Sequence, residues 1–210
     1  MTAVAEFLKN PIAFLEANRL QVKFSNDNAG VYDMSIESEG DNSYALVSGR
    51  GLRAYWCPYN ADQVHAVTLG SDADFMFTAT MNGCSFGIGS PSPDGAVRVA
   101  HANTTEHEAI AKVDKGYAKL NINSPNFSKS AAAIGFRHSA MKQQLQLTQL
   151  KSLLAKGGKT MSNHLSSAAY GACDNITTFG IRDSGVWKFY FQGRIKSDIV
   201  GVFPFPKVNS

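Results

Sequence analysis

The chain has 210 residues, of which 44% are hydrophobic and 18% are charged, and its formal net charge is +3. This composition excludes an intrinsically disordered chain and a coiled coil, and the scattered Lys and Arg residues exclude a strongly basic nucleic-acid binder. We therefore expect one globular domain over residues 1–210 with no nucleic-acid partner.

The first residues predict no targeting segment and one short helix. Met1 to Glu6 lack the basic region of a signal peptide and carry an early carboxylate. No apolar run approaches the roughly 18 residues that a membrane-spanning helix needs. Asn10 and Pro11 then favour the start of a helix, because Asn caps helices well and Pro suits the first helical position.

Short β-like runs separated by turn residues follow as far as residue 102. Their spacing of roughly 8–12 residues is typical of a sandwich or barrel. The predicted strands are Gln21–Ser25, Val31–Glu37, Tyr44–Ser48, Leu52–Cys57, His65–Leu69, Asp74–Thr80, Ser85–Ile88 and Val97–Ala102.

Two further helices are predicted in the second half of the chain. Thr105 and Glu108 form a capping box for a helix to about Leu120. Ser139 begins another helix, which ends before Gly157. We interpret its apolar stripe as a core face; it comprises Met141, Leu145, Leu150 and Leu154.

The tail returns to β structure. Asn175–Arg182 and Val186–Gln192 flank the turn residues Asp183 to Gly185, which predicts a hairpin. Val200–Pro206 contains two prolines and is expected at a sheet edge. The fold class is therefore α+β: a β-sandwich-like core of short, mainly antiparallel strands with two or three flanking helices.

The three cysteines require an explanation. Cys57, Cys84 and Cys173 are odd in number and lack the spacing of a zinc site, so we expect free thiols, no metal and no cofactor. Cys57 and Cys173 are interpreted as structural or incidental. Asp72 and Asp74 lack a third ligand within sequence reach, which makes a metal site there improbable.

Cys84 is the candidate nucleophile. It follows the turn residues Asn82 and Gly83 at the start of a strand, where backbone N–H groups around Gly83 and Ser85 can bind an oxyanion. His101 ends another predicted strand, and if the two strands are neighbours its imidazole can stabilise a Cys84 thiolate. The alternative is that the thiol is a small buried hydrophobe and the histidine an ordinary core residue. His107 lies on the first turn of the helix predicted from Thr105 and is interpreted as a solvated surface residue. His65, His138 and His164 show no partner pattern.

The stretch from Tyr55 to Asn103 resembles the catalytic region of the cytotoxic necrotizing factor family of bacterial glutamine deamidase toxins. The residues that carry the resemblance are Asn82-Gly83-Cys84, with Asn in place of the usual Ser, and Val97 to His101. Thr78 matches a threonine of the active site in a small single-domain member. The order of Thr, Gly-Cys and strand His is the specific part of the match.

The resemblance implies a cysteine-dependent protein glutamine deamidase. Cys84 attacks the amide, His101 transfers the proton, and Thr78 orients His101 or lines the pocket. It also implies a secreted or delivered effector that acts in the host cytosol, with a small GTPase or a translation factor as substrate, and we expect a monomer. Three alternatives remain. The enzyme catalyses transglutamination, it is another Cys-His amidase or peptidase, or the protein is a non-enzymatic β-sandwich binding or adhesion module.

Overall fold

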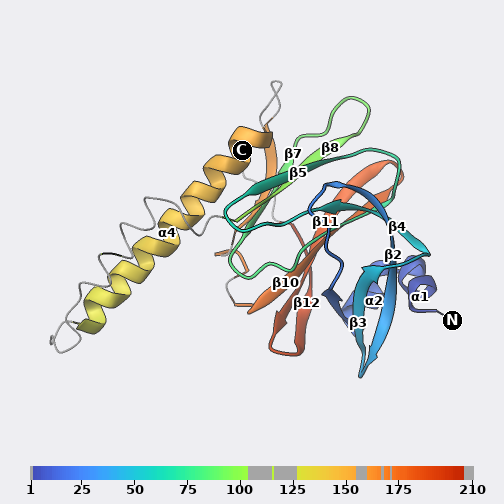
Figure 1. Cartoon of the computed structure of the whole chain (residues 1–210), viewed down its shortest axis with the longest axis horizontal. Helices are drawn as coiled ribbons and strands as arrows, with labels where there is room; N and C mark the ends of the chain where they lie inside the picture. Colours follow the sequence, from blue (N-terminus) through green and yellow to red (C-terminus); the bar gives the residue numbers. More distant parts are fainter. Residues whose placement is uncertain are drawn as a thin grey trace.

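The computed structural model describes residues 2–103, 115, 127–154, 160–166, 168–170 and 172–205. Two β-sheets form the body, and helices flank them (Figure 1). Sheet A has eight strands in the order β1-β3-β2-β4-β6-β10-β11-β12, and sheet B has four in the order β5-β8-β7-β9. The prediction of an α+β fold with a β core is confirmed.

The strands have the following bounds: β1 Arg19–Val22, β2 Gly30–Gly40, β3 Ser43–Ser48, β4 Leu52–Cys57, β5 Val64–Leu69, β6 Phe75–Thr78, β7 Ser85–Gly89, β8 Val97–Ala102, β9 Met161–Leu165, β10 Asn175–Asp183, β11 Val186–Ile195 and β12 Asp198–Pro204. The helices are α1 Ala3–Lys9, α2 Pro11–Ala17 and α4 Phe127–Leu154. Most strand pairs are antiparallel, while β1 with β3 and β4 with β6 are parallel.

Sheet A is barrel-like, which corrects the expectation of a plain sandwich. Its edge strand β1 is tied back to the far end of the sheet through Leu20. The Leu20 N–H donates to Gln192 Oε1 (3.1 Å), and its carbonyl accepts from Thr177 Oγ1 (2.8 Å) and Arg194 Nη1 (2.6 Å). These side chains satisfy the edge backbone groups of β1, which curves the sheet toward closure.

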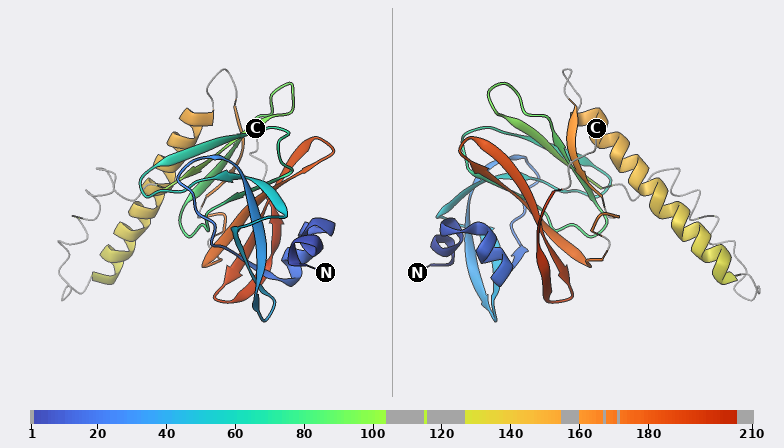
Figure 2. Two further views of the ribbon diagram at one scale, coloured as in Figure 1. Left: turned by 45° about the vertical axis from the view of Figure 1, so that its right-hand side comes forward. Right: turned by 180° about the vertical axis from the view of Figure 1, so that it is seen from behind.

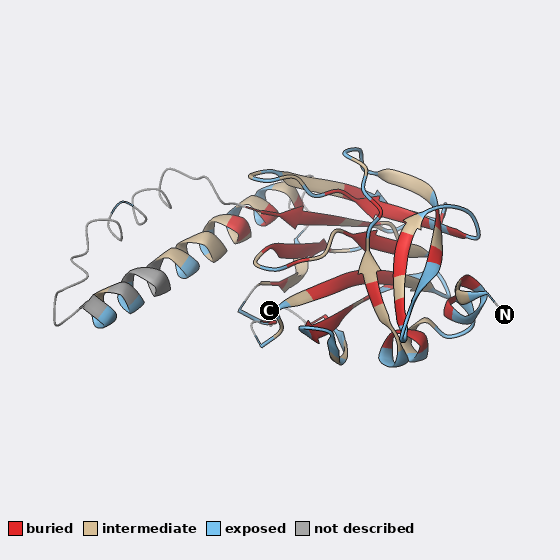
Figure 3. Cartoon of the chain, turned by 60° about the horizontal axis from the view of Figure 1, so that its bottom comes forward, coloured by how far each residue is buried: buried red, intermediate tan, exposed pale blue. Residues whose placement is uncertain are grey.

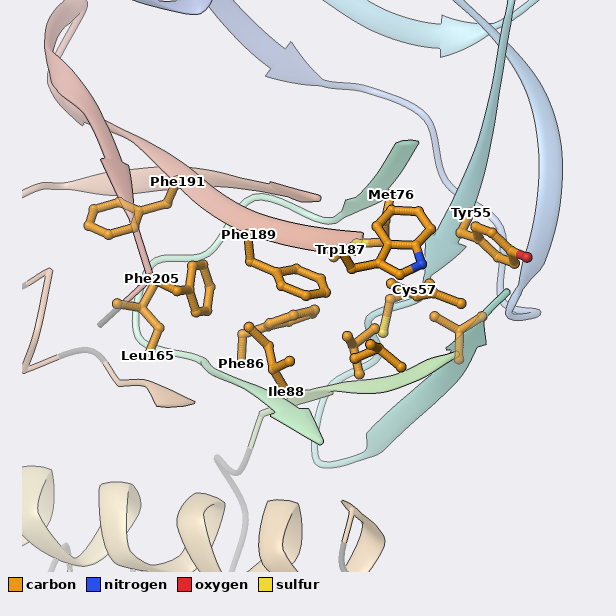
Figure 4. Close-up of a cluster of buried hydrophobic side chains, with 14 of the residues drawn as sticks. Tyr55, Cys57, Met76, Phe86, Ile88, Leu165, Trp187, Phe189, Phe191 and Phe205 are labelled. Atoms are coloured by element: carbon orange, nitrogen blue, oxygen red, sulfur yellow. The ribbon is translucent and has the colours of Figure 1, made fainter. Parts of the chain in front are cut away.

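The main core lies between the inner faces of the two sheets. Phe86 and Ile88 of β7 point toward Trp187 and Phe189 of β11 across this core (Figure 4). Alternation along the strands produces this arrangement, because every second side chain of a strand faces the same side. Trp187, Phe189 and Phe191 of β11 are therefore core residues.

A second core lies on the outer side of sheet A, where α1 and α2 cover it (Figures 1 and 2). Phe7 of α1 and Leu15 of α2 are fully buried there. The Asn10 side chain accepts from the Ala13 N–H, and Pro11 is the first residue of α2, which confirms the helix start expected at this pair. Helix α1 was not predicted.

Helix α4 packs its C-terminal half on the outer face of sheet B, and its N-terminal part projects from the body (Figures 2 and 3). Leu150 and Leu154 are buried against this sheet, as predicted for the apolar stripe, whereas Met141 and Leu145 of the same stripe are only half-buried. The approach is close at Gly87, where a Cβ atom would lie 2.7 Å from Leu154 Cδ1. The predicted start at Ser139 is wrong, because the helix begins at Phe127.

Several strands agree closely with the sequence prediction. Leu52–Cys57 and Val97–Ala102 have the predicted bounds, the β10–β11 hairpin forms, and β12 lies at the edge of sheet A. Strand β9 was not predicted, since its residues lack strand-like alternation. The helix expected from Thr105 to Leu120 lies almost entirely outside the described residues. Within the described parts of the chain, no helix is long and apolar enough to cross a membrane.

Candidate active site

Cys84 and His101 come from neighbouring strands. Strands β7 and β8 pair antiparallel, with Phe86 opposite His101 and Ser85 opposite Ala102. Cys84 directly precedes β7 on the segment that crosses from sheet A to sheet B. Extending the register by one pair places Cys84 opposite Asn103 and diagonal to His101, and diagonal neighbours lie roughly 7–8 Å apart. The expectation that the two strands are neighbours is confirmed.

His101 projects into the interface between the sheets. It continues the inward-facing row of Val97 and Val99 on β8, and it is 1% exposed. The alternate residues Ala100 and Ala102 instead face α4. The imidazole therefore occupies a dry position at the end of the main core.

Thr78 of sheet A meets His101 of sheet B across this interface. Thr78 Oγ1 lies 2.7 Å from His101 Nδ1 and donates its own proton to the carbonyl of Cys57, also at 2.7 Å. A hydroxyl has one proton, so Thr78 must accept the second hydrogen bond, and His101 must carry its proton on Nδ1. These two hydrogen bonds leave the lone pair of the imidazole on Nε2, which is therefore the nitrogen that can act as a base.

The Nε2 atom of His101 is buried and has no hydrogen-bond partner among the described residues. Burial, together with the smaller effect of His65 opposite it on β5, lowers the pKa of His101 to about 3. The imidazole is therefore neutral over the physiological range. An unpaired buried nitrogen is costly in a purely structural role.

The Cys84 thiol is also neutral in this structure. It is 3% exposed, and burial raises its pKa to about 11. The ammonium of Lys142 and the backbone N–H of Asn82 act in the opposite direction. The environment therefore favours the neutral thiol rather than the expected thiolate. The proton must leave the sulfur as Cys84 attacks its substrate.

Tyr59 lies close to both candidate residues. Its ring centroid is 5.2 Å from that of His101, and its hydroxyl accepts a hydrogen bond from Asn103 Nδ2 (2.9 Å). Burial raises the pKa of the Tyr59 hydroxyl, and the negative charges of an ionised Cys84 and of Asp62 raise it further. Tyr59 is 38% exposed, so it lies between this pair and solvent.

Two buried polar side chains clamp the turn before Cys84. The Tyr170 hydroxyl accepts from the Gly83 N–H (2.9 Å) and donates to the Cys84 carbonyl (2.7 Å). On the other side Gln146 of α4 donates to the Gly83 carbonyl (3.3 Å) and accepts from the Ser85 hydroxyl (2.6 Å). The clamp fixes the turn, whose Gly83 has φ +131°.

This clamp already uses one of the backbone N–H groups that were expected to bind an oxyanion. The Gly83 N–H already binds Tyr170, and the Ser85 side chain points toward α4 rather than toward His101. The Asn82 N–H contacts the Cys84 sulfur. An oxyanion would therefore need the Cys84 N–H or a rearrangement of the Tyr170 contact.

Sequence reasoning missed five residues around the pair. His65 was left without a partner, although its strand register places it opposite His101. Tyr59, Lys142, Gln146 and Tyr170 come from loops or from α4, and no local pattern connects them to Cys84. Gln146 is fully buried, which is unusual for glutamine, but this burial is visible only in the structure.

The remaining thiols differ in environment. Cys57 is fully buried, with a pKa raised to about 12 by burial, and Cys173 is partly exposed. His107 lies outside the described residues. Among those that are described, no group of three or more His, Cys, Asp or Glu side chains is placed to hold a metal ion.

Comparison of the sequence with protein-family models and with curated proteins finds no match.

Proposed function

We propose that the protein is a cysteine-dependent glutamine deamidase that hydrolyses a side-chain amide of a protein substrate. The observation that carries the proposal is the pair of linked hydrogen bonds that joins His101 Nδ1 to Thr78 Oγ1 and Thr78 Oγ1 to the Cys57 carbonyl. It prepares Nε2 as a general base at the end of β8, beside the strand that Cys84 precedes.

The neutral resting pair defines the order of proton transfer. The Cys84 sulfur bonds to the glutamine amide carbon while its proton passes to His101 Nε2. The protonated imidazole then donates that proton to the amide nitrogen, and the C–N bond breaks to release ammonia. Water, deprotonated by the same nitrogen, hydrolyses the thioester to glutamate and restores the thiol.

Lys142 and Asn82 assist the first step. Both lower the pKa of Cys84, and Lys142 Nζ would lie 3.6 Å from a Cβ atom placed on Gly83. A nearby ammonium stabilises sulfur as it gains negative charge. Thr78 is a positioning residue, because it acts through His101.

The resemblance to the cytotoxic necrotizing factor family, and especially to its small member Burkholderia lethal factor, supports this assignment. By the same resemblance we propose an effector that acts in the host cytosol on a small GTPase or a translation factor, as a monomer. Entry of a primary amine instead of water would make the reaction a transglutamination.

The test is incubation of the full chain with host-cell lysate, followed by peptide mass spectrometry. Deamidation converts a glutamine to glutamate, transglutamination attaches an added biotinylated amine, and a peptidase cleaves the chain. Cys84→Ala and His101→Gln should each abolish the modification, while Cys173→Ala should retain it. The proposal would be refuted if both Cys84→Ala and His101→Gln still modified the substrate.

One observation favours a second candidate, a non-enzymatic binding module. Cys84 is nearly fully buried and its thiol is neutral, as in a structural core residue. Under this alternative no glutamine changes in the lysate, and Cys84→Ala alters stability alone.

A further inference from the structure

A basic groove of about 280 Å³ lies beside the candidate turn. Its positively charged residues are Arg19 of β1, Arg194 of β11 and Lys196 of the turn after β11, and Asn82 forms part of its wall. None of its described lining residues is acidic. Residues far apart in the sequence therefore bring three cations together at this point.

Arg194 is 3% exposed, although it carries a charge. Its Nε donates to Asn175 Oδ1 (2.7 Å) and its Nη1 to the Leu20 carbonyl (2.6 Å), and both acceptors are neutral. Within the described part of the chain, no carboxylate forms an ion pair with this guanidinium. A buried charge without a counter-charge is strongly unfavourable, so the groove is ready to accept an anion.

Arg19 adds to this positive field, whereas the carboxylate of Asp174 beside Lys196 opposes it in part. Arg19 uses Nε and Nη2 to donate to the neutral Ser43 Oγ (3.1 and 2.8 Å). Burial and the charge of Arg19 lower the pKa of Arg194 to about 10. The carboxylate of Asp174 accepts the Lys196 backbone N–H (2.7 Å). An incoming oxyanion would relieve the repulsion between the two guanidinium groups.

The groove is within reach of a substrate held at Cys84. Asn82 lies in its wall, and Cα atoms two residues apart are separated by at most about 7 Å. An extended substrate segment advances about 3.3 Å per residue. A side chain two or three residues from the target glutamine can therefore enter the groove.

We infer that this groove binds an oxyanion of the substrate protein, namely the carboxylate of an Asp or Glu close to the target glutamine. Two guanidinium groups and one ammonium are opposite in charge to a carboxylate and supply N–H donors for its two oxygens. That the carboxylate belongs to the substrate protein rests on the proposed function, whereas binding of an anion to the groove does not.

The first experiment measures anion binding to the full chain without any catalysis. Succinate and inorganic phosphate are titrated at constant ionic strength, and thermal unfolding and the amide resonances of residues 80–82 are followed. We expect both anions to raise the Tm, with a smaller rise for Lys196→Glu. Lys9→Glu makes the same charge change on the exposed end of α1 and should retain the full rise.

Absence of any anion-dependent rise in the wild type would overturn the groove site. Binding of phosphate alone would overturn the carboxylate assignment and point to a phosphorylated side chain. Arg194→Gln is a second variant, and its circular dichroism separates loss of binding from loss of the fold, since Arg194 also holds Leu20.

The second experiment compares glutamine peptides that carry Glu, phosphoserine or Ala within three residues of the glutamine, with ammonia release as the readout. We expect kcat/KM to favour the Glu peptides, and Lys196→Glu to lower the ratio of Glu over Ala peptides about tenfold. Deamidation of Glu and Ala peptides at the same kcat/KM would overturn the inferred role of the groove but would still support the proposed function. No deamidation of any peptide, with anion binding intact, counts against the function alone.

Discussion

Thr78 Oγ1 and His101 Nδ1 lie 2.7 Å apart and join the two sheets through a buried hydrogen bond. Thr78 belongs to β6 of sheet A, and His101 belongs to β8 of sheet B. Because Thr78 donates to the Cys57 carbonyl, this contact determines which nitrogen of the imidazole is basic.

Replacement of Thr78 by Val should reduce kcat/KM about 10- to 100-fold, a part of the roughly 10²–10⁴ that a general base contributes. Val cannot accept from Nδ1 or donate to Cys57, so the tautomer of His101 is no longer fixed. Thr78→Ser keeps the hydroxyl and should retain most activity. Nitrogen chemical shifts of His101 report the tautomer directly, and an unchanged Nδ1–H form in Thr78→Val would contradict the assignment.

Stability should decrease as the pH falls below about 6.5, the ordinary pKa of histidine. The folded-state pKa of His101 is about 3, so between these values the unfolded chain binds a proton that the folded chain does not. The contribution of His101 to the free energy of unfolding is therefore fully present above pH 6.5 and is lost progressively toward pH 3.

Urea unfolding of the wild type and of His101→Gln at several pH values measures this contribution. In the variant the free energy of unfolding should change less steeply with pH between the two pKa values of His101. The pH dependence that remains includes the contribution of His164, whose pKa is also lowered by burial. Equal slopes in the two proteins would show that His101 is not held neutral.

Lys142→Met should slow alkylation of Cys84 by iodoacetamide, because the ammonium lowers the pKa of this thiol. With a pKa of about 11, labelling of Cys84 in the wild type should be slow near neutral pH and rise as the pH increases. Lys129→Met, on an exposed position of the same helix, is the matched control and should leave the rate unchanged. Peptide mass spectrometry separates Cys84 from the more accessible Cys173.

The clamp around Gly83 can be measured by a double-mutant cycle. Gln146→Leu leaves the Ser85 hydroxyl and the Gly83 carbonyl without their partner and should destabilise the fold by about 1–3 kcal/mol. Adding Ser85→Ala should cost less than the two single changes summed, since it removes one of the unsatisfied groups. Strict additivity would indicate that this hydrogen bond contributes nothing.

Tyr170→Phe tests the other side of the clamp. It removes the acceptor of the Gly83 N–H and the donor to the Cys84 carbonyl, and should destabilise the fold by about 1–2 kcal/mol. A fall in kcat with KM unchanged identifies Tyr170 as a positioning residue for Cys84. An increase in kcat would instead indicate that the freed Gly83 N–H serves as an oxyanion donor.

The sequence by itself determined many of the strands and the candidate pair, although it missed α1, β9 and the start of α4. Period-two alternation and turn residues defined β4, β8 and the β10–β11 hairpin, because these signals act over a few residues. The position of Cys84 before one strand and His101 at the end of another was also readable. Cys84 and His101 are therefore the part of the proposed site that the sequence alone identified.

Only the tertiary structure decided what surrounds this pair. The partner of His101 comes from the other sheet, and the clamp on Gly83 comes from Gln146 and Tyr170, which lie more than sixty residues away in the sequence. The charge state of the pair also depends on burial between two sheets, a property that no local pattern encodes. The sequence allowed a Cys84 thiolate stabilised by His101, whereas desolvation holds both groups neutral.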